Sequence, residues 1–262
     1  MKGSQWRGRG HPLGNLRVAG SFLTRVPLHV SGDLDLAAAT PWFPAVGLLI
    51  GVAGAVVVAG GLAVLAPGVA AALGLVATAL ITGAFHHDGL ADIADAFGGG
   101  WDRAQRLAIL KDSRHGTYGV VSLVLSILVQ WSALASLPRP WAIIGLMAAH
   151  MLGRAAILGV LLVARPARPE GLGTDYSVGL NRWGCAVAIV VSALLAGVML
   201  GWWVGPTVGA VCLTTGAVVW LAYRKIGGIS GDVLGAAEQL AESAVLIVAA
   251  AAAHTGRLPW WR

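Results

Sequence analysis

Long apolar stretches are the feature that most limits what this chain can fold into. A helix needs about 20 mostly apolar residues to cross the roughly 30 Å hydrocarbon core of a bilayer. Stretches near that length lie at residues 42–66, 68–97, 117–137, 141–164, 183–203, 206–223 and 233–253. Of the 262 residues, 57% are hydrophobic and only 11% are charged. We therefore expect an all-α, polytopic integral membrane helical bundle with about seven transmembrane helices.

The basic residues predict the orientation of these helices, because Lys and Arg concentrate in cytoplasmic loops. With a cytoplasmic N-terminus, most of the 18 Lys and Arg residues fall on the cytoplasmic side. They are Lys2, Arg7, Arg9, Arg17, Arg25, Arg103, Arg106, Lys111, Arg114, Arg165, Arg168, Arg182, Arg224 and Lys225. We expect a protein of the inner (cytoplasmic) membrane whose polar loops face the cytoplasm. The net charge of +6 then reflects topology and anionic lipids or substrates, not nucleic acid.

Two parts of the chain are distinguished by composition. Residues 1–30 are basic, contain no apolar run typical of a secretory signal, and suit the membrane interface. Residues 31–262 are expected to form one transmembrane helical catalytic domain, in which the Ala, Gly and Val of residues 45–80 allow close helix packing. Cys185 and Cys212 lie inside apolar stretches and are interpreted as small core residues.

An acidic segment, His86 to Asp95, lies at the end of the apolar stretch 68–97, whose part up to Phe85 is expected to span the membrane. If it is helical, Asp88, Asp92 and Asp95 are spaced i, i+4 and i+7 and share one face. Three like charges on one face repel and require a cation, and hard oxygen ligands favour Mg²⁺. Zinc is a weaker alternative, because it prefers several N or S ligands at tight spacing. His86 is interpreted as a hydrogen-bond partner of the carboxylates or as a proton acceptor.

A second polar segment runs from Lys111 to Gly119. It combines the cations of Lys111 and Arg114 with Asp112, with hydroxyl groups that include Ser113, and with Gly116, where backbone can approach a ligand closely. This mixture suits a phosphate or pyrophosphate. The alternative is a plain loop that is basic only because it is cytoplasmic.

A third segment is rich in glycine and enters the last apolar stretch; it includes Gly228, Gly231 and Asp232. A glycine-rich helix start is a recurrent anion site. Asp232 is interpreted equally well as a metal ligand or as a helix cap. Glu238 and Glu242 follow it and could add oxygen ligands, although hydrogen bonding within the bundle is the favoured interpretation.

Two arginines are further candidates. Arg154, one turn after His150, lies in the middle of an apolar stretch, where a charge is costly unless it faces a cavity or a partner. Arg25 carries a weaker signal, because an arginine on the cytoplasmic side needs no further explanation.

Five motifs together resemble the cobalamin 5′-phosphate synthases, also called adenosylcobinamide-GDP ribazoletransferases. They are F-x-T-R-x-P (22–27), H-x-D-G-L-A-D-x-x-D (86–95), K-D-S-R-x-G-x-x-G (111–119), Gly171-Leu172-Gly173 and G-G-x-[ST]-G-D-x-L-G-A (227–236). The resemblance runs from about residue 16 to about residue 250. His87 and His115 stand where this family more often has aliphatic residues, and Ser230 where it often has Thr.

The resemblance implies an Mg²⁺-dependent membrane enzyme that joins adenosylcobinamide-GDP to α-ribazole or its 5′-phosphate and releases GMP. In that reaction we expect Asp88, Asp92 and Asp95 to hold Mg²⁺, with Asp112 or Asp232 completing or flanking the site. Lys111, Arg114 and Arg154 would hold phosphates, and His86 or a carboxylate would accept the proton of the attacking hydroxyl. Arg25, Ser113, Gly116, Gly228 and Gly231 are the remaining candidates for substrate binding. The number of metal ions and the formation of a homo-oligomer stay open.

Two other classes of protein also fit parts of this sequence. A CDP-alcohol phosphotransferase also carries aspartates at the end of a span, but here Asp92 departs from the A-R pair of that signature and the downstream D-x3-D is absent. A non-enzymatic, ion-coupled transporter would instead bury its acids at mid-span.

Overall fold

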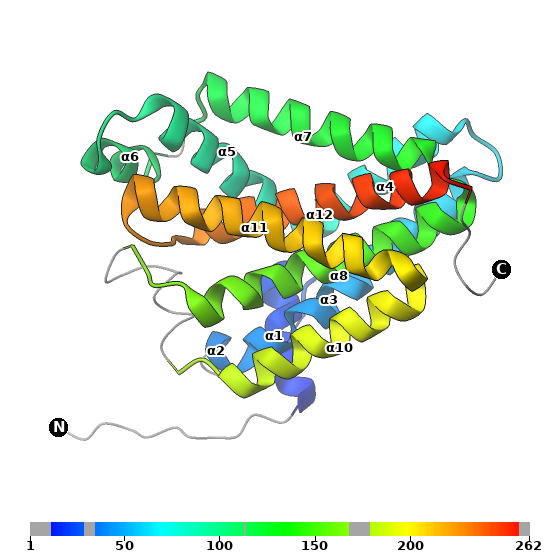
Figure 1. Cartoon of the computed structure of the whole chain (residues 1–262), viewed down its shortest axis with the longest axis horizontal. Helices are drawn as coiled ribbons and strands as arrows, with labels where there is room; N and C mark the ends of the chain where they lie inside the picture. The colour runs from blue at the N-terminus through cyan, green and yellow to red at the C-terminus, as the bar shows by residue number, and fades with distance from the viewer. Residues whose placement is uncertain (1–11, 29–34, 113, 168–178, 257–262) are drawn as a thin grey trace.

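The computed structural model describes residues 12–28, 35–112, 114–167 and 179–256. The helices are α1 (Pro12–Leu23), α2 (Leu36–Ala39), η1 (Thr40–Trp42), α3 (Phe43–Gly61), α4 (Pro67–Thr82), α5 (Phe85–Gly99), α6 (Arg103–Ile109), α7 (Thr117–Ser136), α8 (Arg139–Val163), α10 (Arg182–Leu200), η2 (Gly201–Trp203), α11 (Val204–Ile226) and α12 (Gly231–His254). The only β pairing within these residues is one bridge between Pro166 and Ile229. The expected all-α bundle is confirmed (Figure 1).

Five helical segments of the described chain are long and apolar enough to cross a membrane, and the pair α4 and α5 makes a sixth if it is counted as one span. One of the five, Arg182–Ile226, contains both α10 and α11. Gly201 ends α10 with φ 61° and ψ −134°, and the chain turns back there (Figure 1). With this division, every apolar stretch expected from the sequence has a helical counterpart.

The stretch 68–97 is not one continuous helix but is divided between α4 and α5. α4 and α5 meet at 90°. Gly83 (φ 64°) and Ala84 (φ 56°) both adopt the left-handed conformation at the junction, which is costly for a residue other than glycine. α5 therefore leaves the direction of α4 and carries the acidic residues to the end of the bundle where α6 lies (Figure 1).

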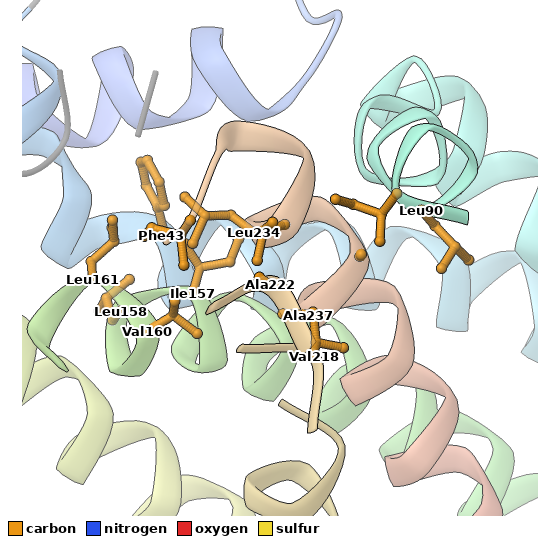
Figure 2. Close-up of a cluster of buried hydrophobic side chains, with 14 of the residues drawn as sticks. Phe43, Leu90, Ile157, Leu158, Val160, Leu161, Val218, Ala222, Leu234 and Ala237 are labelled. Carbon is orange, nitrogen blue, oxygen red and sulfur yellow. The ribbon is translucent and has the colours of Figure 1, made fainter. Parts of the chain in front are cut away.

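The centre of the bundle is formed by α8 and α12, the helices with the largest share of buried residues among the long apolar ones. α3 lies very close to α8 because Gly47 and Gly51 face its backbone; a Cβ at Gly47 would lie 2.3 Å from the carbonyl oxygen of His150. This confirms the expected close packing by small residues. Figure 2 shows the apolar cluster in which α3, α5, α8, α11 and α12 meet, around Phe43, Leu90 and Ile157.

The polar segments gather at one end of the molecule. α5, α6, the start of α7, the end of α11 and the start of α12 lie together at the left of Figure 1, although they span more than half of the sequence. Arg103 on α6 strengthens this arrangement: its guanidinium donates to the carbonyl oxygens of Ile226 (2.8 Å) and Ala167 (3.0 Å). Cations at a helix C-terminus satisfy carbonyl groups that have no partner within the helix. The three motifs that suggested chemistry are thus held close together.

Candidate active site

Asp88 and Asp92 form the core of the candidate site. They project from the same face of α5, as their i, i+4 spacing predicts. His115, in the segment between α6 and α7, lies against both: its Nε2 is 3.6 Å from Oδ1 of Asp88 and its Nδ1 is 3.7 Å from Oδ1 of Asp92. The donor atoms of the three residues lie within 4.8 Å of one another, close enough to hold a metal ion. Sequence reasoning did not identify His115, although it lies inside the second motif.

The electrostatics of this group favour a cation. The pKa of Asp92 is raised to about 6, first by burial and then by the negative charges of Asp88 and Asp232. Like charges disfavour the ionised form of a carboxyl group, and His115 offsets only part of their effect on Asp92. A divalent ion would relieve that repulsion.

Asp232 approaches the group from the first turn of α12 and contributes to its charge. Ser230, not Asp232, is the N-cap of this helix, since its hydroxyl accepts a hydrogen bond from the amide of Val233 (3.4 Å). The Ser230 hydroxyl also donates to the Asp232 carboxylate (3.1 Å). Of the two interpretations that the sequence left open for Asp232, the helix cap is excluded because Ser230 takes that position, and its role as a metal ligand stays a prediction.

Close contact between α5 and α12 sets this geometry. A Cβ at Gly89 would lie 2.9 Å from the carbonyl oxygen of Asp232 and 3.2 Å from the Cα of Gly235. Only a residue without a side chain allows the two backbones to approach this closely. Gly89 therefore fixes the separation between the aspartates of α5 and Asp232.

Asp95 binds backbone amides at the start of α7. Its carboxylate is buried and accepts hydrogen bonds from the amides of Gly116 (2.6 Å) and Gly119 (2.8 Å), at the start of α7. A Cβ at Gly119 would lie 2.3 Å from this carboxylate. The glycines of the second motif thus make room for Asp95, which satisfies free amides at a helix N-terminus. The structure does not bring Asp95 into the group of Asp88, Asp92 and His115.

The cations of the second motif lie on the surface. Arg114 forms a bidentate ion pair with Asp112, with a shortest distance of 2.5 Å, and this arginine lowers the pKa of Asp112 to about 2. Lys111 is exposed, and Ser113 lies outside the described residues. Asp112 is therefore paired with Arg114 and is not among the residues that come together as a possible metal site.

A second, buried polar cluster lies inside the bundle. Arg154 of α8 is 1% exposed and pairs with Glu238 and Glu242 of α12. His150 contacts Arg154 (2.9 Å), and His86 of α5 contacts Glu238 (3.2 Å) and Arg154 (3.4 Å). The sequence predicted that Arg154 would face a cavity or a partner, and the structure supplies partners. The favoured interpretation of the two glutamates, bonding within the bundle, is also confirmed.

This arrangement separates His86 from the aspartates. Side chains two positions apart on a helix point about 200° away from each other. His86 therefore faces the interior while Asp88 faces the opposite way. The geometry gives no support to His86 as a hydrogen-bond partner of the carboxylates. Nor does it place Arg154 among exposed groups that could reach a phosphate.

The remaining predicted substrate-binding residues lie at connections between helices, outside the acidic cluster. Gly228 lies where the α11–α12 connection pairs with the segment after α8; a Cβ there would lie 2.6 Å from the carbonyl oxygen of Arg165. Gly231 begins α12. Arg25 lies against the α4–α5 junction: its amide donates to Ile81 (2.7 Å), and its side chain covers Gly83. The motif Gly171-Leu172-Gly173 lies outside the described residues.

The fold and this site define the class of protein: an integral membrane helical bundle with a carboxylate and imidazole cluster at one polar end. Comparison with known proteins narrows the class. Residues 15–250 match the cobalamin-5-phosphate synthase family, and the chain belongs to it.

Curated relatives cover nearly the whole chain. The adenosylcobinamide-GDP ribazoletransferase of Bradyrhizobium diazoefficiens is 44% identical, over 91% of this chain and 94% of its own. Those of Mesorhizobium japonicum (42%, over 88% and 90%) and Ralstonia nicotianae (37%, over 89% and 93%) are similar. No solved structure matches the chain. The resemblance inferred from the five motifs is confirmed, and neither a CDP-alcohol phosphotransferase nor a transporter is needed to explain them.

Proposed function

We propose that this protein joins adenosylcobinamide-GDP to α-ribazole or its 5′-phosphate, releasing GMP, with Mg²⁺ held by the acidic cluster. A ribose hydroxyl of the ribazole attacks the phosphorus that is linked to cobinamide. The bond from this phosphorus to the bridging oxygen breaks, and GMP leaves with that oxygen. The observation that carries the proposal is the meeting of Asp88, Asp92 and His115, with the charge of Asp232 acting on Asp92, at the polar end of a chain that belongs to this family.

The donor set fits Mg²⁺. Carboxylate oxygens are its preferred protein ligands, and Mg²⁺ usually keeps water and substrate phosphates as the rest of its shell. The side chains of Asp88 and His115 are 62% and 40% exposed, so one side of the cluster is open to such ligands. Bound there, Mg²⁺ would neutralise the charge of the pyrophosphate and of the leaving GMP.

The chain's own residues bind and orient the substrates. The exposed side chains of Lys111 and Arg114 lie in the segment that carries His115, and suit the phosphates. The ion pair of Arg114 with Asp112 does not prevent this, because an exposed pair contributes little and exchanges partners readily. A carboxylate of the cluster is the best-placed proton acceptor for the attacking hydroxyl, because His86 lies in the buried cluster.

The most direct test is product analysis with protein purified in detergent. We expect GMP and a cobalamin product of matching mass from adenosylcobinamide-GDP and α-ribazole, and loss of both when EDTA is added. GMP formed at an unchanged rate in EDTA would exclude the metal. Absence of GMP with every divalent ion tried would exclude the proposed activity.

We propose further that the protein resides in the inner membrane and that the site faces the cytoplasm, because the basic residues gather on the side of the site. Cysteine labelling tests this orientation in a variant that lacks the two native cysteines. Lys111→Cys, beside the site, should be labelled by a membrane-impermeant reagent only after the cells are opened. Val64→Cys, on the α3–α4 connection at the other end, should be labelled in intact spheroplasts. The reverse pattern would exclude the orientation.

A further inference from the structure

We propose that His115 is a nitrogen ligand of the metal site and that it shifts the preference of the site from Mg²⁺ toward Mn²⁺. This inference rests on the proposed function and specifies its metal. An all-oxygen site would follow from the aspartates alone; the imidazole changes the chemistry of the site.

The separations favour shared coordination over a hydrogen bond. The ring nitrogens of His115 lie 3.6 and 3.7 Å from the oxygens of Asp88 and Asp92, too far for hydrogen bonds. Around one octahedral ion with bonds of about 2.1 Å, neighbouring ligands lie about 3 Å apart and opposite ligands about 4.2 Å apart. The two measured distances involve different ring nitrogens, and an ion bonds to only one of them. One nitrogen of His115 and one oxygen of each aspartate lie within 4.8 Å of one another, so small side-chain movements bring all three residues onto one ion.

The backbone on both sides of His115 is held in place. Before it, the amide of Arg114 donates to the carboxylate of Asp112 (3.1 Å). After it, the amide of Gly116 donates to Asp95 (2.6 Å). Because Asp95 and the two aspartates of the cluster belong to the same helix, α5 positions both the imidazole and the carboxylates. The ligand set is thus largely formed in advance of metal binding.

The nitrogen donor of His115 predicts which metal ion the site prefers. Mg²⁺ prefers oxygen ligands and loses water reluctantly, whereas imidazole suits later divalent metals better. A site with two carboxylates and one imidazole should bind Mn²⁺ more tightly than Mg²⁺. Removing the imidazole should weaken Mn²⁺ binding at least about tenfold, the range found when metal-ligand support is lost, and should change Mg²⁺ binding less.

Mn²⁺ can also serve as the experimental probe of this ligand, because its unpaired electrons couple to the nucleus of a bound nitrogen atom. Purified protein loaded with Mn²⁺ should show ¹⁴N modulation in electron spin echo experiments, and histidine labelled with ¹⁵N should change the modulation frequency. His115→Leu should abolish the modulation while retaining weaker Mn²⁺ binding. His254→Leu, an exposed histidine at the other end of α12, is the matched control and should change neither.

The outcomes separate this inference from the proposed function. Mn²⁺ binding that depends on Asp92 but shows no ¹⁴N modulation, or a modulation that survives in His115→Leu, would overturn the role of His115 and leave the proposed function standing. Mn²⁺ binding that is unchanged in Asp92→Asn would overturn the metal site itself, and this inference with it. GMP release, measured on the same samples, tests the transferase activity independently.

Discussion

Replacing Arg154 with methionine should destabilise the bundle strongly. Arg154 is 1% exposed, and its guanidinium is the cation shared by Glu238 and Glu242, which are 0% and 3% exposed. Methionine preserves much of the apolar stem that packs on Gly47, so the change removes mainly the charge. Removing one partner of a buried ion pair costs about 3–5 kcal/mol, because the other partner stays buried without compensation.

The assay is equilibrium unfolding in mixed micelles, followed by tryptophan fluorescence, together with thermal unfolding. For a chain of this size, a loss of about 3–5 kcal/mol corresponds to a drop in Tm of roughly 10 °C. Arg139→Met, at the exposed start of the same helix, is the matched control and should change the free energy of unfolding by less than about 0.5 kcal/mol.

A triple variant separates charge from packing. Arg154→Met combined with Glu238→Gln and Glu242→Gln removes all three charges, and should recover most of the lost stability, because a buried ion pair and a neutral replacement are often close in free energy. A single Arg154→Met variant that loses less than about 1 kcal/mol would refute the description of this cluster as a compensated set of buried charges. So would a triple variant less stable than the single one.

Two further changes test the polar end of the bundle. Asp95→Ala should lower the free energy of unfolding by about 1–2 kcal/mol, as loss of a helix cap does, and should speed amide hydrogen exchange at Gly116 and Gly119. It should change Mn²⁺ affinity far less than Asp92→Asn does. Equal effects of the two variants on Mn²⁺ affinity would make Asp95 a ligand. Gly89→Ala should push α5 away from α12, which should lower the free energy of unfolding by about 1–3 kcal/mol and reduce turnover. Gly99→Ala is the control, because a Cβ there would meet nothing within 4 Å, and it should change neither stability nor turnover.

Local patterns in the sequence predicted much of this structure. The apolar stretches identified the membrane helices, and the i, i+4 spacing identified the shared face of Asp88 and Asp92, because both properties depend only on neighbouring residues. The bend at Gly83 and Ala84 was not predicted, since hydropathy continues across it. It arises from two left-handed residues and from the docking of Arg25, a contact between distant parts of the chain.

Residues that act through distant partners were the least predictable. Asp95 has the right helical spacing for a shared ligand, yet its partners are amides 21 and 24 residues away. Arg154 was correctly expected to need a partner, but Glu242 lies 88 residues further along the chain. His115 was missed as a donor because nothing in its own segment shows that the segment folds back over α5.

The measurement that tests the central claim most directly is GMP release from adenosylcobinamide-GDP and α-ribazole by Asp92→Asn, compared with Asp35→Asn. Asp35 caps α2, where Asn caps equally well, so this control makes the same chemical change away from the site. We predict wild-type turnover for Asp35→Asn, and no detectable GMP from a folded Asp92→Asn protein at any Mg²⁺ or Mn²⁺ concentration. Near-normal turnover of Asp92→Asn would contradict the assignment of the acidic cluster as the catalytic metal site.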